Sequence, residues 1–182
     1  MKLHPRIVKI LDRIAKPFGL ILHNPEKPHL PWPTSFSTVD IAIIDPYKHT
    51  ILLGKKRATG RWCIIGGFTD ASSLTDEEDA IRELKEETGI VAQEHELRYI
   101  GNFKIPDGRY ENTPHAIRTH YYILKVDSDK VPSGPDAPED PEIETTEWFS
   151  LKDRFDLIEG DDPFIGPAHK ILISALKRHL GA

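Results

Sequence analysis

The stretch that decides the fold is GGFTDASSLTDEEDAIRELKEETGI, residues 66–90. It predicts a helix over residues 76–88. Thr75 followed three positions later by Glu78 forms a capping box, and acidic residues fill the first turn, where the helix dipole favours them. Gly89 then supplies the C-terminal stop. The stretch therefore predicts a glycine-rich turn that leads into one amphipathic helix.

This helix carries three carboxylates on one side. At about 100° per residue, Glu83, Glu86 and Glu87 fall within roughly one 100° arc, next to an apolar arc that faces the core. Like charges at these spacings repel one another, and the helix dipole disfavours anions near its C-terminus. A run of glutamates is ordinarily a solvated acidic face. Here a Gly-Gly turn directly precedes the helix, so oxygen donors converge from two elements, which favours a site for Mg²⁺ or Mn²⁺.

The second half of the stretch resembles a known family motif. The Nudix box reads G-x5-E-x7-R-E-U-x-E-E-x-G-U, with U apolar, and RELKEETGI at residues 82–90 matches it without exception. The approach through Gly60, Arg61 and Trp62 into Gly-Gly-Phe is also similar to that of many members. The similarity runs from about residue 39 to residue 148. It implies an α/β fold, the Nudix-type α/β/α sandwich with a mixed β-sheet.

The resemblance also implies an activity, which is hydrolysis of a nucleoside diphosphate linked to another moiety. By matching position, Glu83, Glu86 and Glu87 would hold divalent metal, and Gly66 would add its backbone carbonyl. Arg82 would orient the glutamates, although it could also be an ordinary ion-pair partner within the helix. Mg²⁺ is the implied cofactor, and Mn²⁺ accepts the same oxygen ligands. Such metals bridge diphosphate oxygens and generate hydroxide from bound water.

The first half of the box departs from the family pattern. Leu74 stands where the family has Glu, and the spacing from Gly67 is one residue longer than usual. Asp70, Asp76 or Glu77 could supply the missing carboxylate, and the sequence does not choose among them. A catalytically silent Nudix protein that only binds a nucleotide is therefore an alternative to an enzyme.

The general base varies within the family and often lies outside the box. Carboxylates before or in the last expected strand are candidates, because a base there could reach the attacking water. They are Glu139, Asp140, Glu142 and Glu144. We assign Glu142 to the catalytic set, while each of the four could equally be a solvated loop acid.

The substrate is indicated by a shorter similarity. FKIPDGRY at residues 103–110 and IRTH at residues 117–120 are similar to Nudix domains fused to nicotinamide-nucleotide adenylyltransferases, whose usual substrate is ADP-ribose. This implies hydrolysis of ADP-ribose to AMP and ribose 5-phosphate, with a nucleoside triphosphate or dinucleotide polyphosphate as the alternative substrate. Arginines could hold phosphate or ribose oxygens and an aromatic ring could stack on the base. The expected substrate-binding residues are Arg57, Arg61, Arg109, Tyr110 and Arg118.

Apolar and β-branched runs predict the remaining elements. Strands are expected over residues 39–44, 50–54, 62–65, 96–105, 116–126 and 142–150, and a helix over residues 165–180. A loop should span residues 127–141. We expect residues 1–33 to form an N-terminal helix and a Pro-rich linker, and residues 34–182 to form the Nudix domain.

Composition sets outer bounds on function. The chain has 182 residues, 38% hydrophobic and 29% charged, with a net charge of -5, which excludes a disordered protein and argues against nucleic acid as the main partner. The lone Cys63 cannot form an intrachain disulfide. No secretory signal or membrane-spanning run is visible, so we expect a cytoplasmic protein that meets a small-molecule nucleotide, not a nucleic acid or a membrane. A homodimer would fit the resemblance, because relatives that act on ADP-ribose are commonly dimers.

Overall fold

The computed structural model describes residues 34–107, 115–131, 142–157 and 165–181. Within these ranges the strands are β1 (Ser35–Asp45), β2 (Thr50–Lys56), β3 (Trp62–Cys63), β4 (Ile65–Phe68), β5 (Arg98–Ile105), β6 (Ala116–Lys125) and β7 (Ile143–Ser150). The helices are α2 (Asp76–Thr88), α3 (Leu151–Leu157) and α4 (Pro167–Leu180), with 3-10 helices η2 (Glu94–Glu96) and η4 (Ser128–Lys130). In this part of the chain no helix is long and apolar enough to cross a membrane. The expected N-terminal helix and linker, and most of the long loop, lie outside the described residues.

The strands form one mixed sheet in the order β3-β2-β1-β6-β5. β1 and β6 run parallel, and the other pairs are antiparallel. β4 and β2 both pair with β1, β4 along residues 38–41 and β2 along residues 43–45, while β7 pairs with β2. Because β6 occupies the other edge of β1, β4 and β2 follow one another along a single edge. The candidate site lies where β1 changes partner.

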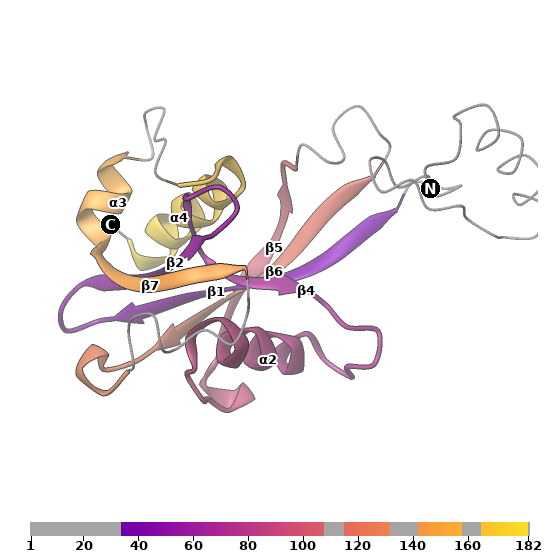
Figure 1. Ribbon diagram of the computed structural model, residues 1–182, viewed down its shortest axis with the longest axis horizontal. Coiled ribbons are helices and arrows are strands. Elements are labelled where there is room, and N and C mark those ends of the chain that lie inside the picture. Colours follow the sequence, from indigo (N-terminus) through magenta and orange to yellow (C-terminus); the bar gives the residue numbers. More distant parts are fainter. Residues whose placement is uncertain (1–33, 108–114, 132–141, 158–164, 182) are drawn as a thin grey trace, which may run out of the picture.

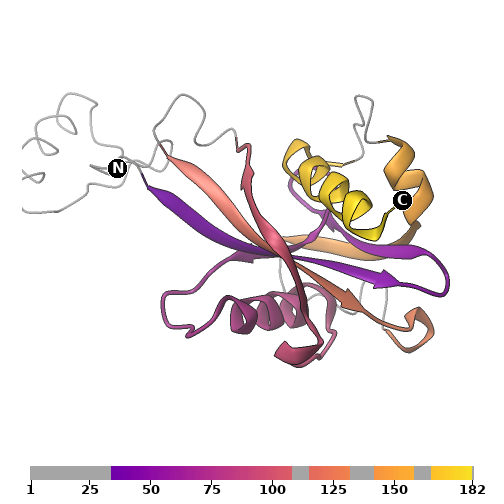
Figure 2. The ribbon, with the colours of Figure 1, turned by 180° about the vertical axis from the view of Figure 1, so that it is seen from behind.

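Helices cover both faces of the sheet, with α2 on one side and α3 and α4 on the other (Figure 1, and from behind in Figure 2). Alternation along β1 explains the two layers, because successive side chains of a strand point to opposite faces. Val39, Ile41 and Ile43 belong to the core beneath α2, whereas Ala42 and Ile44 belong to the core beneath α4. The predicted α/β/α sandwich with a mixed sheet is confirmed.

The central helix α2 has the predicted bounds and caps. Thr75 Oγ1 accepts a hydrogen bond from Glu78 N–H at 3.1 Å, and Gly89 adopts φ 73° while its N–H donates to Lys85 O at 2.8 Å. The return half of the expected capping box differs, because the Glu78 carboxylate accepts from Leu74 N–H at 2.7 Å. The loop before α2 is thereby tied to the helix one residue earlier than predicted.

Several elements differ from the sequence expectation. β1 begins at Ser35 because parallel pairing with β6 extends it beyond its apolar run. The single strand expected over residues 62–65 is two strands, since β3 pairs with β2 and β4 pairs with β1. β5 begins at Arg98 because residues 94–96 form η2 instead. Helix α3 was not predicted, since it is short and its described side chains include two buried apolar ones, Leu151 and Phe155.

Candidate active site

Strand β4 and helix α2 bring the Gly-Gly turn against two of the glutamates. Gly66 N–H donates to Glu87 Oε2 at 2.8 Å. A Cβ placed on Gly67 would lie 2.6 Å from the carboxylate atoms of Glu83. Both glutamates are buried, at 7% and 3% exposure for Glu83 and Glu87. Glycine is therefore required here because the carboxylates pack directly on the strand backbone.

Arg82 joins the carboxylates of α2 to one another. Its Nη1 donates to Glu83 Oε1 at 2.7 Å and to Glu86 Oε2 at 3.1 Å. Its Nη2 donates to Asp79 Oδ1 at 3.1 Å and to Phe68 O at 3.0 Å. These contacts agree with the orienting role that the family motif implies for Arg82. Arg82 also contacts a buried aspartate and the end of β4, so it is more than one half of an ion pair within the helix.

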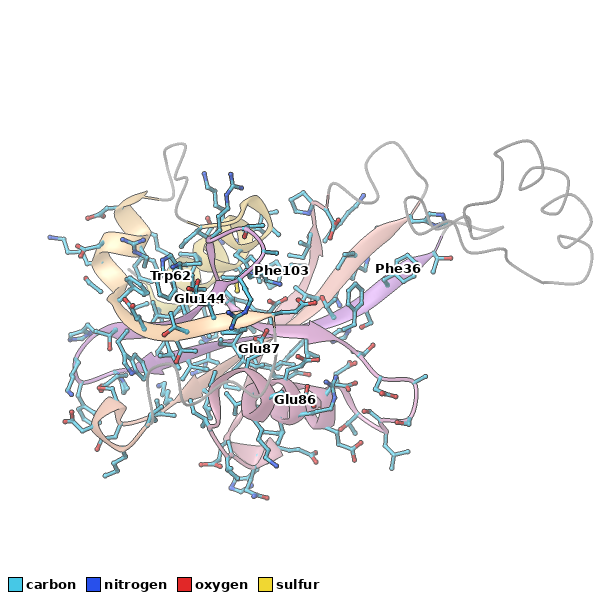
Figure 3. All side chains as sticks on the ribbon, in the orientation of Figure 1. Phe36, Trp62, Glu86, Glu87, Phe103 and Glu144 are labelled. Atoms are coloured by element: carbon cyan, nitrogen blue, oxygen red, sulfur yellow. The ribbon has the colours of Figure 1, made fainter. Side chains whose placement is uncertain are left out.

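A cleft of about 410 Å³ opens beside these groups. Four of the predicted site residues line it, namely Gly66, Glu83, Glu87 and Glu142. Glu86 does not line it, and its side chain is 42% exposed. Figure 3 shows Glu87 between α2 and the sheet, and Glu86 further out on the helix. The structure thus brings together two of the three expected metal-binding glutamates at the cleft.

The candidate general bases also differ in whether they line the cleft. Glu142 lines the cleft, and its Oε2 lies 3.9 Å from Lys56 Nζ. Glu144 on β7 (Figure 3) pairs with Lys55 at 3.2 Å and is not part of the lining. The candidates at positions 139 and 140 lie outside the described residues. Glu142 is therefore the described candidate with access to the cleft.

The described members of the expected substrate-binding set do not line the cleft. Arg57 and Arg61 are exposed on the loop between β2 and β3. Arg118 on β6 donates to Asn102 Oδ1 at 3.1 Å, and none of these three lines the cleft. Arg109 and Tyr110 lie outside the described residues. All five assignments stay predictions.

None of the three expected substitutes for the carboxylate missing at Leu74 lines the cleft. Leu74 is 89% exposed. The carboxylate of Asp70 accepts hydrogen bonds from Ser72, and Glu77 accepts one from the Tyr122 hydroxyl at 3.1 Å. Asp76 Oδ2 lies 3.2 Å from the imidazole of His120. The three expected substitutes therefore contact other partners.

The lining residues that sequence reasoning missed include Asp40 on β1, Lys56 on β2 and His169 on α4. Burial raises the pKa of Asp40 to about 7, against the lowering effect of a 2.6 Å hydrogen bond from the Thr119 hydroxyl. A carboxylate inside an apolar strand, and a histidine one turn before Leu172 on a helix, were the available signals. Neither of these sequence features indicates which cavity the aspartate or the histidine side chain lines.

Comparison with known proteins decides the family. The model of the NUDIX domain matches residues 34–166, more than half of the chain. The chain belongs to the Nudix family of pyrophosphohydrolases. A search of curated proteins gave no match.

Solved Nudix structures share this fold. The NUDIX domain of Shewanella oneidensis NrtR, crystallised with ADP ribose, is 18% identical with a TM-score of 0.62, over 80% of this chain and 88% of that one. A MutT/nudix family protein from Enterococcus faecalis is 20% identical with a TM-score of 0.59, over 97% of this chain and 71% of that one. At these identities the likeness concerns the fold alone.

Nudix enzymes generally use divalent metal ions. Among the described residues, no group of three or more His, Cys, Asp or Glu side chains is arranged to hold a metal ion. Mg²⁺ often needs only one or two protein carboxylates, because waters and substrate phosphates complete its octahedron. Glu83 and Glu87 at the cleft satisfy this smaller requirement, whereas Glu86 is held by Arg82 outside the lining.

Proposed function

We propose that this Nudix protein hydrolyses the diphosphate of ADP-ribose, giving AMP and ribose 5-phosphate, in a reaction that depends on Mg²⁺ or Mn²⁺. The observation that carries the proposal is the convergence of the buried Glu83 and Glu87 carboxylates on the Gly66-Gly67 backbone at the cleft. Two carboxylates that are buried one helical turn apart at a cleft repel each other and have lost hydration, and positive charge at the cleft offsets both costs. A divalent cation shared with a diphosphate supplies such charge.

The choice of ADP-ribose rests on two supports. Both stretches that resemble the ADP-ribose-directed Nudix domains reach the cleft, the first through Ile105 and Asp107 and the second through Ile117. The NrtR domain with the same fold was crystallised with ADP ribose. A nucleoside triphosphate or a dinucleotide polyphosphate remains the alternative substrate, since fold alone does not separate them.

Several residues in or beside the cleft have a role in this reaction. Glu83, Glu87 and the Gly66 carbonyl would hold the metal, and Arg82 keeps the Glu83 carboxylate in place through its 2.7 Å hydrogen bond. When bound, the metal neutralises charge on the diphosphate and lowers the pKa of bound water. Glu142 accepts a proton from the attacking water, whose oxygen bonds to one phosphorus as the bridging P–O bond breaks. Lys56 places a positive charge among these acidic groups.

The substitution Glu87→Gln tests the assignment. Glutamine can still accept the hydrogen bond from Gly66 N–H, so the fold should persist, while the loss of the anionic ligand should lower turnover of ADP-ribose by about 100-fold or more. Glu94→Gln, an exposed change on η2, is the matched control and should keep wild-type turnover. Full Mg²⁺-dependent turnover by Glu87→Gln would show that the metal site lies elsewhere.

The exposed Leu74 favours a second candidate, a protein that binds a nucleotide without hydrolysing it. The box carboxylate is missing at this position, and its three expected substitutes, Asp70, Asp76 and Glu77, do not line the cleft. Calorimetry with ADP-ribose and Mg²⁺ separates the two candidates. Binding that persists without formation of AMP would favour the silent protein.

A further inference from the structure

His169 reaches the cleft from the helical layer opposite α2. It lies in the first turn of α4, and its side chain is 19% exposed. The start of α4 is fixed to the sheet, since Gly166 N–H donates to Trp62 O at 3.3 Å and a parallel bridge joins Trp62 to Ile165. The histidine is therefore held by the scaffold at one wall of the cleft.

A backbone hydrogen bond sets the tautomer of this histidine. Ile64 N–H donates to His169 Nδ1 at 3.3 Å, and a ring nitrogen that accepts carries no proton. Burial lowers the pKa of His169 to about 4, so the ring is neutral near pH 7. Asp40 Oδ1 lies 3.8 Å from the same Nδ1, beyond hydrogen-bond distance. The single proton of the ring is therefore on Nε2.

The Nε2–H donor has no acceptor among the described residues. The His169 side chain lines the cleft and is partly exposed there. The ring lies close to the Gly-Gly turn, because Ile64 comes two residues before Gly66 and Asp40 is the cross-strand partner of Gly66. A ligand oxygen placed beside this turn would complete the hydrogen bonding of His169.

We propose that His169 Nε2–H donates a hydrogen bond to an oxygen of the substrate's diphosphate, from the wall of the cleft opposite Glu83 and Glu87. The inference rests on the proposed function to the extent that the ligand contains a diphosphate. The diphosphate is the part of the substrate that meets this donor, because the glutamates and the turn lie beside it.

Two substitutions separate this role from a structural one. In His169→Asn the side-chain oxygen can still accept from Ile64 N–H, but no donor stands at the Nε2 position. In His169→Gln the amide nitrogen reaches that position, and the acceptor for Ile64 is lost. We expect the KM for ADP-ribose to rise about 10-fold in His169→Asn and less than about 3-fold in His169→Gln, with kcat within about 2-fold of wild type in both.

A purely structural histidine would give the opposite ranking. His169→Asn would then keep the wild-type KM and thermal midpoint. His169→Gln would have a higher KM and a lower thermal midpoint, and this pattern would overturn the proposal. His179→Gln, near the other end of α4 and away from the cleft lining, is the matched control and should leave KM unchanged.

A measurement on the wild type keeps the test independent of variant folding. With ¹⁵N-labelled histidine, NMR should show the Nε2–H tautomer at His169 and a downfield shift of that proton when ADP is added in the presence of EDTA. An Nδ1–H tautomer, or an unchanged resonance with ADP bound, would overturn the proposal.

The substrate proposal can fail separately. If the wild type hydrolyses a triphosphate or a dinucleotide polyphosphate in place of ADP-ribose, the same KM ranking with that nucleotide would support the role of His169 while the substrate assignment falls. If the chain neither hydrolyses nor binds any of these nucleotides or ADP, both proposals fall.

Discussion

The adjacent glycines Gly66 and Gly67 are needed for different reasons, the first for the fold and the second for the site. Gly66 has φ 150°, and a Cβ there would lie 2.1 Å from Val39 O, a backbone atom of the paired strand. The neighbouring Gly67 would place its Cβ 2.6 Å from the carboxylate of Glu83, which is the end of a flexible side chain. A methyl group at the first position displaces β1, whereas at the second it displaces only a proposed metal ligand.

Alanine at each glycine should therefore have a different effect. Gly67→Ala should lower turnover by about 10- to 100-fold with a near wild-type unfolding midpoint, because a shift of about 1 Å in a reacting group has that cost. Gly66→Ala should lower the free energy of unfolding by about 2 kcal/mol or more, because a non-glycine residue is strained there and the strand must move. Denaturant unfolding and steady-state kinetics measure the two effects, and a reversed pattern would contradict the site geometry.

Individual site residues differ in how far the sequence reveals them. Glu83 and Glu87 follow from the motif together with the helical spacing. Glu86 shares that motif, yet its place outside the cleft depends on Arg82, whose other contacts come from β4 and from Asp79. Asp40 and His169 come from distant elements, so only tertiary packing brings them to the same cavity.

Among the elements, local signals predicted α2 and tertiary contacts decided the rest. Caps and acidic first-turn residues are encoded within the helix itself, so its bounds could be read directly. The short helix α3 instead depends on contacts from elsewhere, since Leu151 N–H donates to His49 O at 2.9 Å. The division of residues 62–65 into β3 and β4 likewise depends on which neighbour each residue pairs with.

The turn between β1 and β2 depends on one carboxylate. Asp45 Oδ1 accepts from Tyr47 N–H at 2.8 Å and from Lys48 N–H at 3.0 Å, and Oδ2 accepts from Ser128 N–H at 3.0 Å. Hydrogen bonds from Ser128 first, then from the turn amides, hold the pKa of Asp45 well below its usual value. The ionised carboxylate thus ties the turn between β1 and β2 to η4, which follows β6.

A pH dependence follows for this turn. Because the pKa of Asp45 is lower in the folded state, its stabilising effect is complete above the ordinary aspartate pKa of 3.8 and is lost as the pH falls below that value. Asp45→Ala should lower the thermal midpoint at pH 7 and lower it less at pH 3. Asp153→Ala, an exposed control on α3, should change neither value. An Asp45→Ala effect of equal size at both pH values would show that the carboxylate charge does not matter.

At the scale of the whole molecule, the site lies between two separate hydrophobic cores. One core packs under α2 and includes Val39, Ile41 and Leu84, and the other packs under α3 and α4 and includes Ile44, Leu172 and Leu176. Burial of apolar surface on both faces of the sheet stabilises the domain without any metal. The position of the cleft follows from the change of partner along β1.

Removal of metal should therefore abolish activity and leave the fold intact. We expect EDTA to stop turnover, with a change in thermal midpoint of less than about 2 °C, and added Mg²⁺ to restore it. Circular dichroism melts and an assay of AMP formation on the same sample measure both. A large loss of thermal stability in EDTA would indicate a structural metal instead.

The central claim is that the cleft between α2 and α4 hydrolyses the diphosphate of ADP-ribose. Its most direct test is product analysis of the purified protein with Mg²⁺ and, in parallel, ADP-ribose, NADH, a nucleoside triphosphate, a diadenosine polyphosphate and a nucleotide-sugar. We predict AMP and ribose 5-phosphate from ADP-ribose, formed faster than any product from the other four. Faster hydrolysis of another nucleotide would contradict the substrate assignment, and binding of ADP-ribose without any product would contradict the enzyme itself.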